Sequence, residues 1–414
     1  MNLAVLGILA DGVGSGAGAF PTLLRALLER GARVDFYGMR GFNDPRSLEA
    51  LPGYRFVDVR VPFFERLHQA ARRLPSPYPV AGVAQVAHVA YQREAIRLIQ
   101  AEHAHANYTL VLCTDAQALA PSRLPLACWP QSPPHTEAAA LRTATVAKNL
   151  LETHGMARYA AVQLFYAYRR AVARAALDWS DLYLCGSTWA ESEWARFGVA
   201  SERLRTIAYP IKLERYADIP ALGNHAGTVT FLWLGRAVPR KRLDLFLEGF
   251  RILFEREPTV RARLVGNLRS DRSAAPLLRA YEQHPGVSFE GHCLHDAVPK
   301  LFGEVDVLVQ PSQNENFGFS VAEALAAGRA VVLGPSNGTA DYTSTAGVQF
   351  SEYDPNSVAE ALASARNAVL REGPRLTAVA RAAAQRHFSI ATVAERFLAL
   401  CHDAVTNRRR RAAA

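Results

Sequence analysis

The sequence predicts an α/β protein with two parallel-sheet domains, each carrying helices on both faces of its sheet. Short apolar runs that end in Gly, Pro or polar residues alternate with helix-period segments, which is the pattern of repeated β-α units. The chain has 414 residues and is 50% hydrophobic, which is enough for two ordinary cores. A polar, turn-rich segment at 214–228 separates the two halves and is the expected linker.

The expected strands are apolar runs bounded by turn residues. In the first half they are LAVLGIL, RVDFYG, TLVLCTD, LPLACWP, DLYLCGS and RLRTIAYP, and in the second half TVTFLWLG, ARLVG, VSFEG, VDVLVQPS, RAVVLG and GVQF. A helix is expected at 21–31, with Pro21 near its start and Gly31 just after its end, and further helix over about 138–176.

Composition narrows the class of protein. The five cysteines are scattered, odd in number and without C-x-x-C spacing, so neither a disulfide framework nor a zinc site is expected, and a reducing cytoplasm is favoured. The first apolar run has no basic residue before it and is expected to be a buried strand rather than a signal peptide. No segment reaches the roughly 18 uninterrupted apolar residues of a membrane-spanning helix. A soluble, cytoplasmic protein is therefore expected.

The formal net charge of +9 is compatible with nucleic acid, an anionic membrane surface or phosphorylated small molecules as partners. The basic block Arg408–Arg411 is expected to be a frayed, solvated tail, with a membrane-surface contact as the alternative.

A glycine-rich stretch, DGVGSGAGAF, follows the first expected strand and precedes a helix, where backbone N–H groups and the helix dipole can hold a phosphate. Gly14 and Gly16 fit a loose dinucleotide-binding fingerprint, and Asp35 follows about 20 residues later. Asp35 falls inside its strand, however, rather than at the end where a ribose would be held. A loop that lets substrate or phosphate approach the backbone is the favoured interpretation, and a simple tight turn is the alternative.

Two cations follow the first strand of the second half. Arg236 lies at the carboxyl end of FLWLG, and Lys241 lies just before a helix, so both belong to the crevice where open α/β sheets bind ligands. A guanidinium fork and an ammonium suit phosphate oxygens. The alternative is that both are solvated loop cations.

The stretch NENFGFSVAEALAAGRAVVLG contains two glutamates eight positions apart, Glu315 and Glu323. Ser320 and Glu323 form the pattern of a capping box, which would account for Glu323. Glu315 has no such local role, and Phe317 and its neighbours are unusual in a solvated loop. Two carboxylates could instead hold sugar and ribose hydroxyls while the helix N-terminus faces a diphosphate.

These segments, together with GRAVPRKR, LVGN, VSFEGHC and NGTADY, resemble the successive signatures of family 4 retaining glycosyltransferases of the GT-B fold. The resemblance covers most of Leu182–Phe397 and is weaker from Met1 to about Ala176. It implies two Rossmann-like domains facing each other across a cleft, with a C-terminal helix that crosses back. The expected parts are an acceptor-side domain at 1–213, the linker at 214–228, a nucleotide-sugar domain at 229–384, and a crossing helix and basic tail at 385–414.

The resemblance also implies roles for individual residues. Arg236 and Lys241 would neutralise the departing nucleoside diphosphate, and no metal or other cofactor is expected, because the chain contains no D-x-D motif. Glu323 would hold the ribose. The remaining donor-binding residues would be the Gly14–Gly18 loop with Gly16, His292 beside the base, and Glu315 with the backbone of Asn316, Phe317 and Gly318 around the sugar.

Family members carry a histidine after a mid-domain strand of the first half, near the transferred sugar. Here Pro130 takes the nearest equivalent position, so His135 or Gln131 would serve from the following loop. We favour His135, with Glu315, as the catalytic pair, and a plain loop histidine is the alternative.

The resulting hypothesis is a retaining, metal-independent glycosyltransferase that uses a UDP or GDP sugar, acts on a glycan, lipid-linked or small-molecule acceptor, and does not bind nucleic acid. Segment 137–176 is expected to form core helices with a basic face, or alternatively an acceptor or inner-membrane-surface element. The alternative functions are a nucleotide-sugar epimerase or phosphorylase of the same fold, and a non-catalytic sugar-nucleotide-binding protein.

Overall fold

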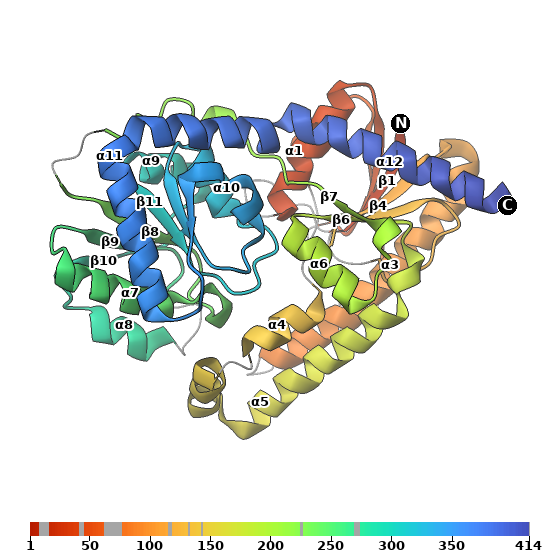
Figure 1. The fold of residues 1–414 in the computed structure, drawn as a ribbon. Coiled ribbons are helices and arrows are strands. Elements are labelled where there is room, and N and C mark those ends of the chain that lie inside the picture. Colours follow the sequence, from red (N-terminus) through yellow and green to blue (C-terminus); the bar gives the residue numbers. More distant parts are fainter. Residues whose placement is uncertain are drawn as a thin grey trace.

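The computed structural model describes residues 1–7, 16–40, 45–61, 77–114, 118–130, 133–141, 144–223, 227–268 and 274–413. Two parallel β-sheets with helices packed around them form two α/β domains (Figure 1). The predicted two-domain architecture is therefore confirmed.

The first sheet has the strand order β3-β2-β1-β4-β5-β6-β7, with every neighbouring pair parallel. Its strands are β1 (Asn2–Leu6), β2 (Arg33–Gly38), β3 (Tyr54–Asp58), β4 (Leu110–Cys113), β5 (Leu126–Cys128), β6 (Leu182–Cys185) and β7 (Leu204–Thr206). The order reverses between β1 and β4, so the glycine-rich stretch follows β1 at a topological switch point. β3 is a half-buried edge strand that the sequence pattern does not predict.

The second sheet has the order β10-β9-β8-β11-β12-β13 and is also parallel. Its strands are β8 (Thr230–Leu234), β9 (Arg261–Val265), β10 (Val287–Gly291), β11 (Val307–Gln310), β12 (Ala330–Leu333) and β13 (Gly347–Gln349). All six strands predicted in this half are confirmed. The strand order reverses between β8 and β11, which places the switch point of this sheet between their carboxyl ends.

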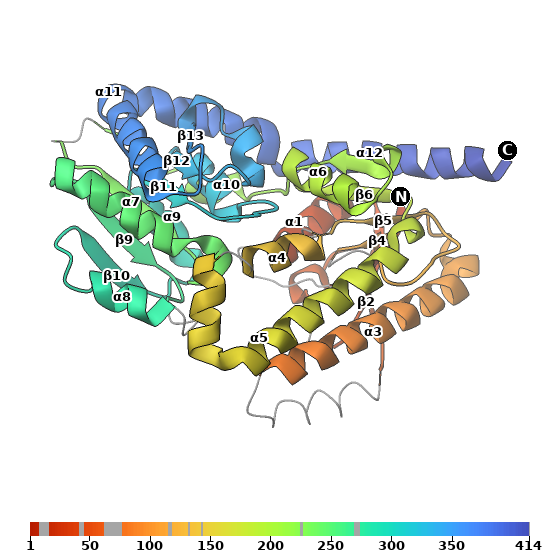
Figure 2. The same cartoon turned by 60° about the horizontal axis from the view of Figure 1, so that its bottom comes forward.

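The helices are α1 (Gly16–Glu29), α3 (Pro77–Ala106), α4 (Pro134–Leu141), α5 (Ala144–Ala175), α6 (Thr188–Phe197), α7 (Leu243–Arg256), α8 (Ala275–Tyr281), α9 (Val298–Gly303), α10 (Phe319–Ala326), α11 (Pro355–Phe388) and α12 (Ile390–Ala413). The helix predicted at 21–31 begins earlier, so Pro21 lies inside α1. The helix predicted over 138–176 corresponds to α4 and α5, and α5 is kinked at Gly155, whose φ is 76°. α3 runs beside α5 in Figure 2 and is not among the helices predicted from the sequence.

The C-terminal helices connect the two domains. α11 lies against α7 of the second domain, the chain bends at Ser389, and α12 packs on α1 of the first domain (Figure 1). Phe397 of α12 is fully buried and stacks on Trp129, with 6.1 Å between ring centroids. The prediction of a frayed, solvated tail is wrong at Arg408. The helix α12 continues to Ala413 and passes close to the start of β6, so the Arg408 guanidinium bonds the Asp181 carboxylate at 2.5 Å.

A buried cluster of aromatic rings joins the domains, and we call it the aromatic joint. Its members are Phe20, Trp129, Tyr209, Phe317 and Phe319. Tyr209 lies at the centre, with ring centroids 5.0 Å from Trp129 on the first domain and 5.1 Å from Phe317 on the second. Beside it, the Ser187 hydroxyl of the first domain donates to the backbone oxygen of Asn316 at 2.8 Å. The domains therefore share a packed interior at this point.

No helix in the described part of the chain is long and apolar enough to cross a membrane.

Replacing Phe397 with alanine should destabilise the protein by about 3–5 kcal/mol, because truncating a buried phenylalanine removes transfer free energy and leaves a cavity. The thermal and urea unfolding midpoints measure this loss. Leu164→Ala is the control, since that side chain is 73% exposed and its truncation should change stability by no more than about 0.5 kcal/mol. Equal midpoints for Phe397→Ala and Leu164→Ala would show that α12 does not anchor to the first domain.

Candidate functional site

The candidate site lies at the carboxyl ends of β8 and β11, where the second sheet has its switch point. The loop after β8 carries Arg236 and continues into the 3-10 turn η5 (Pro239–Lys241). The loop after β11 carries Glu315 and leads into α10. Because parallel strands end at the same edge of the sheet, their topology brings the two loops together.

A buried carboxylate and two cations form the centre of this site. Glu315 is 6% exposed, and its Oε2 lies 2.9 Å from Arg240 Nη1 and 2.5 Å from Lys241 Nζ. Burial alone would raise the pKa of the Glu315 carboxyl, but Arg240 and Lys241 outweigh burial and hold that pKa at about 2. Burial and the positive charges of Arg240 and Arg236 lower the pKa of Lys241, although Glu315 opposes that shift. Glu315 is therefore an ionised acceptor throughout the physiological pH range.

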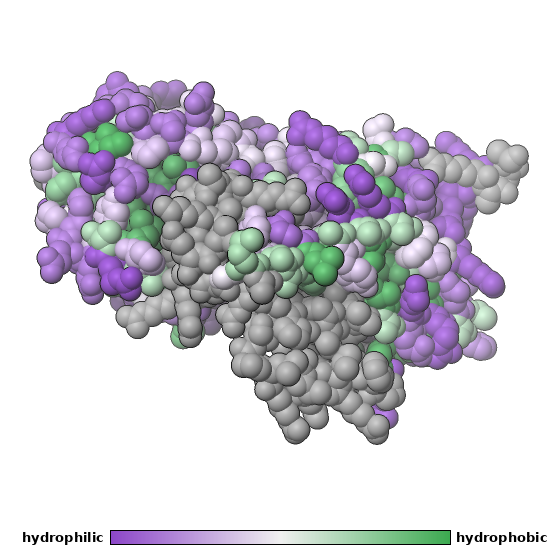
Figure 3. Space-filling view, turned by 90° about the horizontal axis from the view of Figure 1, so that it is seen from below, coloured by the Kyte–Doolittle hydropathy of each residue, from purple (hydrophilic) through white to green (hydrophobic). Residues whose placement is uncertain are grey.

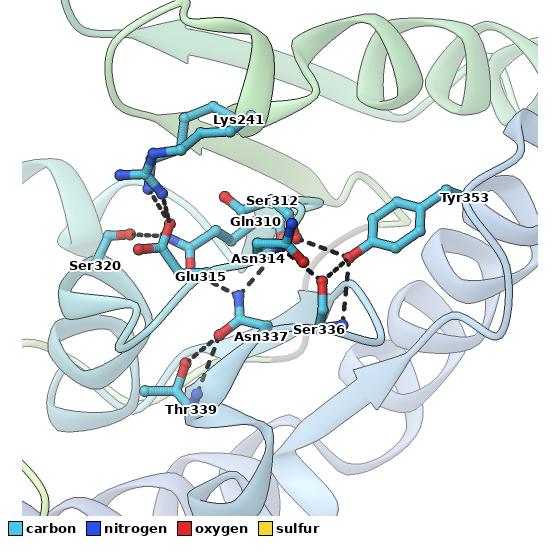
Figure 4. A network of polar contacts seen from close by, with 11 residues as sticks. Lys241, Gln310, Ser312, Asn314, Glu315, Ser320, Ser336, Asn337, Thr339 and Tyr353 are labelled. Atoms are coloured by element: carbon cyan, nitrogen blue, oxygen red, sulfur yellow. Dashed lines mark hydrogen bonds and ion pairs between the residues drawn. The ribbon is translucent and has the colours of Figure 1, made fainter. Parts of the chain in front are cut away.

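Backbone geometry fixes both partners. Asn314, directly before Glu315, has φ 57°, and Arg242, directly after Lys241, has φ 48°, so two non-glycine residues adopt the left-handed region at the site. The Glu315 amide donates to the Ser336 backbone oxygen at 2.9 Å, and the Gly338 amide donates to the Glu315 oxygen at 2.8 Å. Figure 4 shows these loops with the surrounding polar network. This bonding holds the carboxylate under the cations.

The Phe317-Gly318-Phe319 sequence has a structural explanation. Both phenylalanines belong to the aromatic joint, and Phe317 is 3% exposed. A Cβ at Gly318 would lie 2.1 Å from Gln310 Oε1, so only glycine fits there without displacing that side chain. The loop that carries Glu315 is therefore clamped to the domain interface directly after the carboxylate.

The predicted capping box is wrong. α10 begins at Phe319 with Gly318 as its N-cap, and no side chain caps it. Ser320 lies inside the first turn and accepts a hydrogen bond from Gln310 Nε2 at 2.8 Å. The close packing of Gly318 on Gln310, a contact between segments, sets the helix start instead of the local S-x-x-E pattern. Glu323 is thus free of the capping role that the sequence offered for it.

Glu323 projects from α10 toward the 3-10 turn η4 (Leu213–Tyr216) and is 7% exposed. Burial raises the pKa of its carboxyl to about 7, although the Tyr216 hydroxyl and the Arg215 charge both act to lower it. His295 Nδ1 lies 3.7 Å from Glu323 Oε1. The two glutamates therefore differ in protonation: Glu315 is fixed as a carboxylate, whereas Glu323 titrates near neutrality.

The structure adds residues that the sequence analysis missed. Arg240 makes the same ion pair as Lys241 but was passed over in the predicted crevice. Arg215 and His295 lie beside Glu323, and Arg215 falls inside the predicted linker. The position of Arg240 among the basic residues of GRAVPRKR could have indicated its role in the site. Arg215 and His295 are distant in the sequence and come together only in the folded chain. Arg236 is exposed and near enough to Lys241 to affect its pKa.

His292 is exposed and lines a pocket of about 1010 Å³ at the end of the second sheet. Gly266 and Gly291, at the ends of β9 and β10, line it together with the apolar side chains of Leu278 and Phe289. A Cβ on Gly266 would lie 1.9 Å from the Gly235 oxygen, so glycine is required for this close approach of neighbouring loops. The pocket has apolar and polar lining residues, and its Gly266 packs on Gly235, the residue directly before Arg236.

His135 lies in the first turn of α4, on the first domain. Its Nε2 bonds Glu193 Oε2 at 2.9 Å, and its ring stacks on Phe197 with 5.3 Å between centroids. α4 itself contacts η5 across the domains, and Asn314 Nδ2 donates to the backbone oxygen of Thr136 at 2.8 Å. His135 therefore stands next to the contact between domains while its imidazole faces α6.

The residues predicted around the glycine-rich stretch and the following domain have three different outcomes. Gly14 and Gln131 lie outside the described residues, and Gly16 is the first residue of α1. Asp35, which the dinucleotide interpretation would need for a ribose, is fully buried and bonds Arg55 and Tyr108 at 2.7 and 2.6 Å. The Asp35 carboxylate is thus committed to pairing inside the domain.

Residues 228–367 match the family model described as "Glycosyl transferases group 1". Among curated proteins, the chain is similar to a D-inositol 3-phosphate glycosyltransferase of Thermomonospora curvata, at 30% identity over 177 residues that cover 40% of each chain. It is also similar to the mannosylfructose-phosphate synthase of Agrobacterium fabrum, at 32% identity over 25% of this chain and 24% of the relative. The chain spans between about a quarter and a half of the length of the first such relatives.

Solved structures match over the whole chain. Anabaena HepE in complex with UDP superposes with a TM-score of 0.66 at 16% identity, covering 97% of this chain and 100% of HepE. A sucrose-phosphate synthase from Thermosynechococcus elongatus superposes with a TM-score of 0.67 at 18% identity, covering both chains completely. The fold is GT-B. All the strands of the GT-B second domain, and both glutamates, lie inside the segment that matches the group 1 family.

Glu323→Gln should make the protein more stable than wild type at pH 8. Because burial raises the Glu323 pKa from 4.5 to about 7, the stability that its protonated form contributes is present below pH 4.5 and is lost as the pH rises through 7. A neutral amide avoids that loss, and the gain should be on the order of 1–3 kcal/mol.

Unfolding midpoints of wild type and variant at pH 5 and pH 8 provide the measurement, and Glu315→Gln is the matched control. Glu315 has a lowered pKa, so its ionised form contributes stability at both pH values and its amide should destabilise the protein at both. A Glu323→Gln variant that is less stable than wild type at pH 8 would contradict the buried, neutralised carboxyl.

Proposed function

We propose that the chain is a retaining glycosyltransferase that transfers a sugar from a nucleotide-sugar donor, a UDP or GDP sugar, to an acceptor hydroxyl without a metal ion. The observation that carries this proposal is the pair of buried glutamates on one loop-helix unit beside three cations, within a segment that matches the group 1 glycosyltransferase family. HepE, which shares the fold, is described as a complex with UDP and with UDP-glucose.

The cation cluster suits a leaving diphosphate. Arg236, Arg240 and Lys241 place three positive charges around the Glu315 carboxylate. These charges would stabilise the negative charge that develops on the departing phosphate, in a crevice where low dielectric strengthens the interaction. The N-terminus of α10 adds its backbone amides and dipole. The ribose would then reach Glu323, and the base would enter the pocket beside His292.

The transferred sugar would lie between Glu315 and the first domain. Glu315, always ionised, can accept hydrogen bonds from sugar hydroxyls, and the backbone of Asn316, Phe317 and Gly318 borders the same space. The acceptor hydroxyl would approach from α4, where His135 lies. In front-face transfer the leaving phosphate takes the acceptor proton, so no enzyme nucleophile is required.

The decisive experiment is a thermal-shift panel of NAD, UDP, GDP, ADP, dTDP and the corresponding nucleotide sugars, each measured once in EDTA and once with added Mg²⁺. Ligand that binds the native state raises the midpoint by mass action. A shift with one nucleotide in EDTA supports the metal-free site and identifies the donor base. A flat panel, or a shift that requires metal, would refute the proposal, and a shift with NAD alone would favour the dinucleotide interpretation.

Alanine substitutions of the two glutamates should affect different steps, nucleotide binding for Glu323 and turnover for Glu315. Glu323→Ala should weaken nucleotide binding about 10- to 100-fold, because a charge-assisted hydrogen bond to a ligand contributes about 1.5–3 kcal/mol. Glu315→Ala should mainly lower turnover, by about 100-fold or more, since its contacts lie at the reacting sugar. Calorimetry and single-turnover assays on both variants separate these effects. Wild-type behaviour in both would rule out this site.

Epimerase and phosphorylase activities are separated by products. An epimerase would interconvert nucleotide sugars without an acceptor, and a phosphorylase would release sugar phosphate from a glycan in phosphate buffer. A protein that binds the nucleotide sugar but does neither, and also transfers no sugar, would be a binding protein.

We also propose a peripheral contact between α5 and an anionic membrane surface. Met156, Leu164 and Tyr168 are 75%, 73% and 44% exposed, and Arg170 and Arg174 are exposed on the same helix. In Figure 3, where the molecule is seen from below, hydrophobic side chains form a short row near the middle of the face, with hydrophilic ones beside them. Apolar side chains next to arginines match an interface of acyl chains and anionic headgroups.

The protein should therefore sediment with phosphatidylglycerol vesicles and remain in solution with phosphatidylcholine vesicles. The double variant Arg170→Glu/Arg174→Glu should reduce that binding at least about tenfold, because each basic residue near the surface contributes about 1 kcal/mol. Arg375→Glu, an exposed α11 arginine paired with Glu372, is the control. Equal binding to neutral vesicles, or no effect of the double variant, would argue against the contact.

A further inference from the structure

The residues that face Glu323 form an ordered chain outside the predicted site. Arg215 Nη1 bonds His295 Nε2, and Arg215 Nη2 donates to the backbone oxygen of His295 at 2.7 Å. The opposite ring nitrogen, His295 Nδ1, faces Glu323 Oε1 at 3.7 Å. The Arg215 guanidinium therefore contacts both the Nε2 atom and the backbone oxygen of His295, and the Nδ1 atom of His295 faces Glu323.

This arrangement dictates where the imidazole proton lies. An arginine guanidinium stays protonated in proteins and can only donate, so His295 Nε2 must accept. A neutral imidazole that accepts at Nε2 carries its proton on Nδ1, which then points at Glu323. Burial lowers the His295 pKa, and the positive charges of Arg215 and Lys212 lower it further, although Asp296 opposes them, so the neutral form prevails at pH 7.

From this geometry we propose that Arg215 and His295 are positioning residues that present Glu323 as a carboxylate to the ligand. The Nδ1–H dipole lies 3.7 Å from Oε1 and favours the ionised Glu323, and the Tyr216 hydroxyl acts on the same carboxylate in the same direction. The carboxylate can then accept hydrogen bonds from a diol, the chemistry of a nucleotide ribose. This role rests on the proposed nucleotide-sugar site. In it, Glu323 contacts the ligand, and Arg215 and His295 fix the ionisation and orientation of Glu323 without contacting the ligand themselves.

The proposal predicts a pH-dependent affinity. Because burial holds the Glu323 pKa at about 7, about a tenth of the carboxyl is ionised at pH 6 and most of it at pH 8, so affinity for a diol should rise about tenfold over that interval. The other charged or titratable groups facing the pair are Lys212, Tyr216 and Asp296, and lysine, tyrosine and aspartate side chains ordinarily titrate well outside this interval. A nucleotide sugar is the right probe, since its diphosphate diester does not titrate there.

The test measures the calorimetric affinity for UDP-glucose and GDP-mannose between pH 6 and pH 8 in four variants. Arg215→Met and His295→Gln should shift the midpoint of the pH profile upward and weaken binding several-fold at pH 7. His295→Asn places its amide N–H at the Nδ1 position and should bind several-fold more tightly than His295→Gln. Arg256→Met, whose side chain pairs with Glu360 on the surface, is the matched control and should keep the wild-type profile.

A ligand-free measurement separates this inference from the proposed function. Nitrogen-15 NMR of histidine-labelled protein reports the imidazole tautomer, and His295 should carry its proton on Nδ1 in wild type and lose that preference in Arg215→Met. An Nε2-protonated or fully charged His295 overturns the inference whether or not nucleotide sugars bind. The expected tautomer with no nucleotide-sugar binding overturns the proposed function and the ligand role, but upholds the Arg215–His295 pair.

With binding present, a pH profile that is identical in wild type, Arg215→Met and His295→Gln overturns the positioning role. Equal affinities of His295→Asn and His295→Gln have the same meaning, because the retained Nδ1-like donor is the feature on which the role depends.

Discussion

The packing of Tyr209 against Phe317 is the contact on which the molecule depends, because it joins the two domains two residues after the carboxylate of Glu315. Tyr209 also touches Trp129, which stacks on Phe397 of the crossing helix. The ring contacts thus run without a gap from the terminal helix to the Glu315 loop. The Glu315 loop is therefore tied to the packed contact between the domains, and Asn314 in the same loop also bonds the Thr136 backbone of α4.

Electrostatics in the crevice follow from burial. A carboxylate that is 6% exposed is stable there only with partners, and Arg240 and Lys241 provide them. Within this trio, burial and the mutual repulsion of the two cations lower the pKa of Lys241, so their arrangement carries a cost in the folded protein and favours the approach of an anion. The two left-handed residues beside the trio, Asn314 and Arg242, are a second local cost. Both costs fall on the same loops, as expected where binding rather than stability has shaped the sequence.

The sequence could predict what is local. Apolar runs bounded by glycine and proline located all six strands of the second sheet, and their order implied the crevice where Arg236, Lys241 and Glu315 lie. It could not predict β3, since an edge strand buries only part of its side chains and lacks the continuous apolar run. It also missed α3, whose alanines and valines give weak helical periodicity.

Other misses arise from contacts between distant segments. The S-x-x-E pattern predicts a capping box with Ser320 as the N-cap. The observed N-cap is Gly318, two residues earlier, where it packs on Gln310, and this leaves Glu323 without a capping role. Arg215 and His295 are 80 positions apart, so no local pattern connects them. Arg408 was predicted to lie in a solvated tail because its partner Asp181 is 227 positions away in the sequence, and no local pattern indicates that contact.

The eight-residue spacing of the glutamates places one carboxylate before the helix and the other in its second turn, and the two environments give them opposite properties. Glu315 is ionised by neighbouring cations before any ligand arrives, so it can serve as a fixed acceptor. Among the described residues, no lysine or arginine forms an ion pair with Glu323, whose carboxyl sits near its titration point. A ligand that donates hydrogen bonds therefore favours its charged form and is in turn favoured by it. Binding at Glu323 is therefore linked to proton release, whereas binding at Glu315 is not. A spacing that looks symmetrical in the sequence produces one rigid and one responsive acceptor in the folded protein.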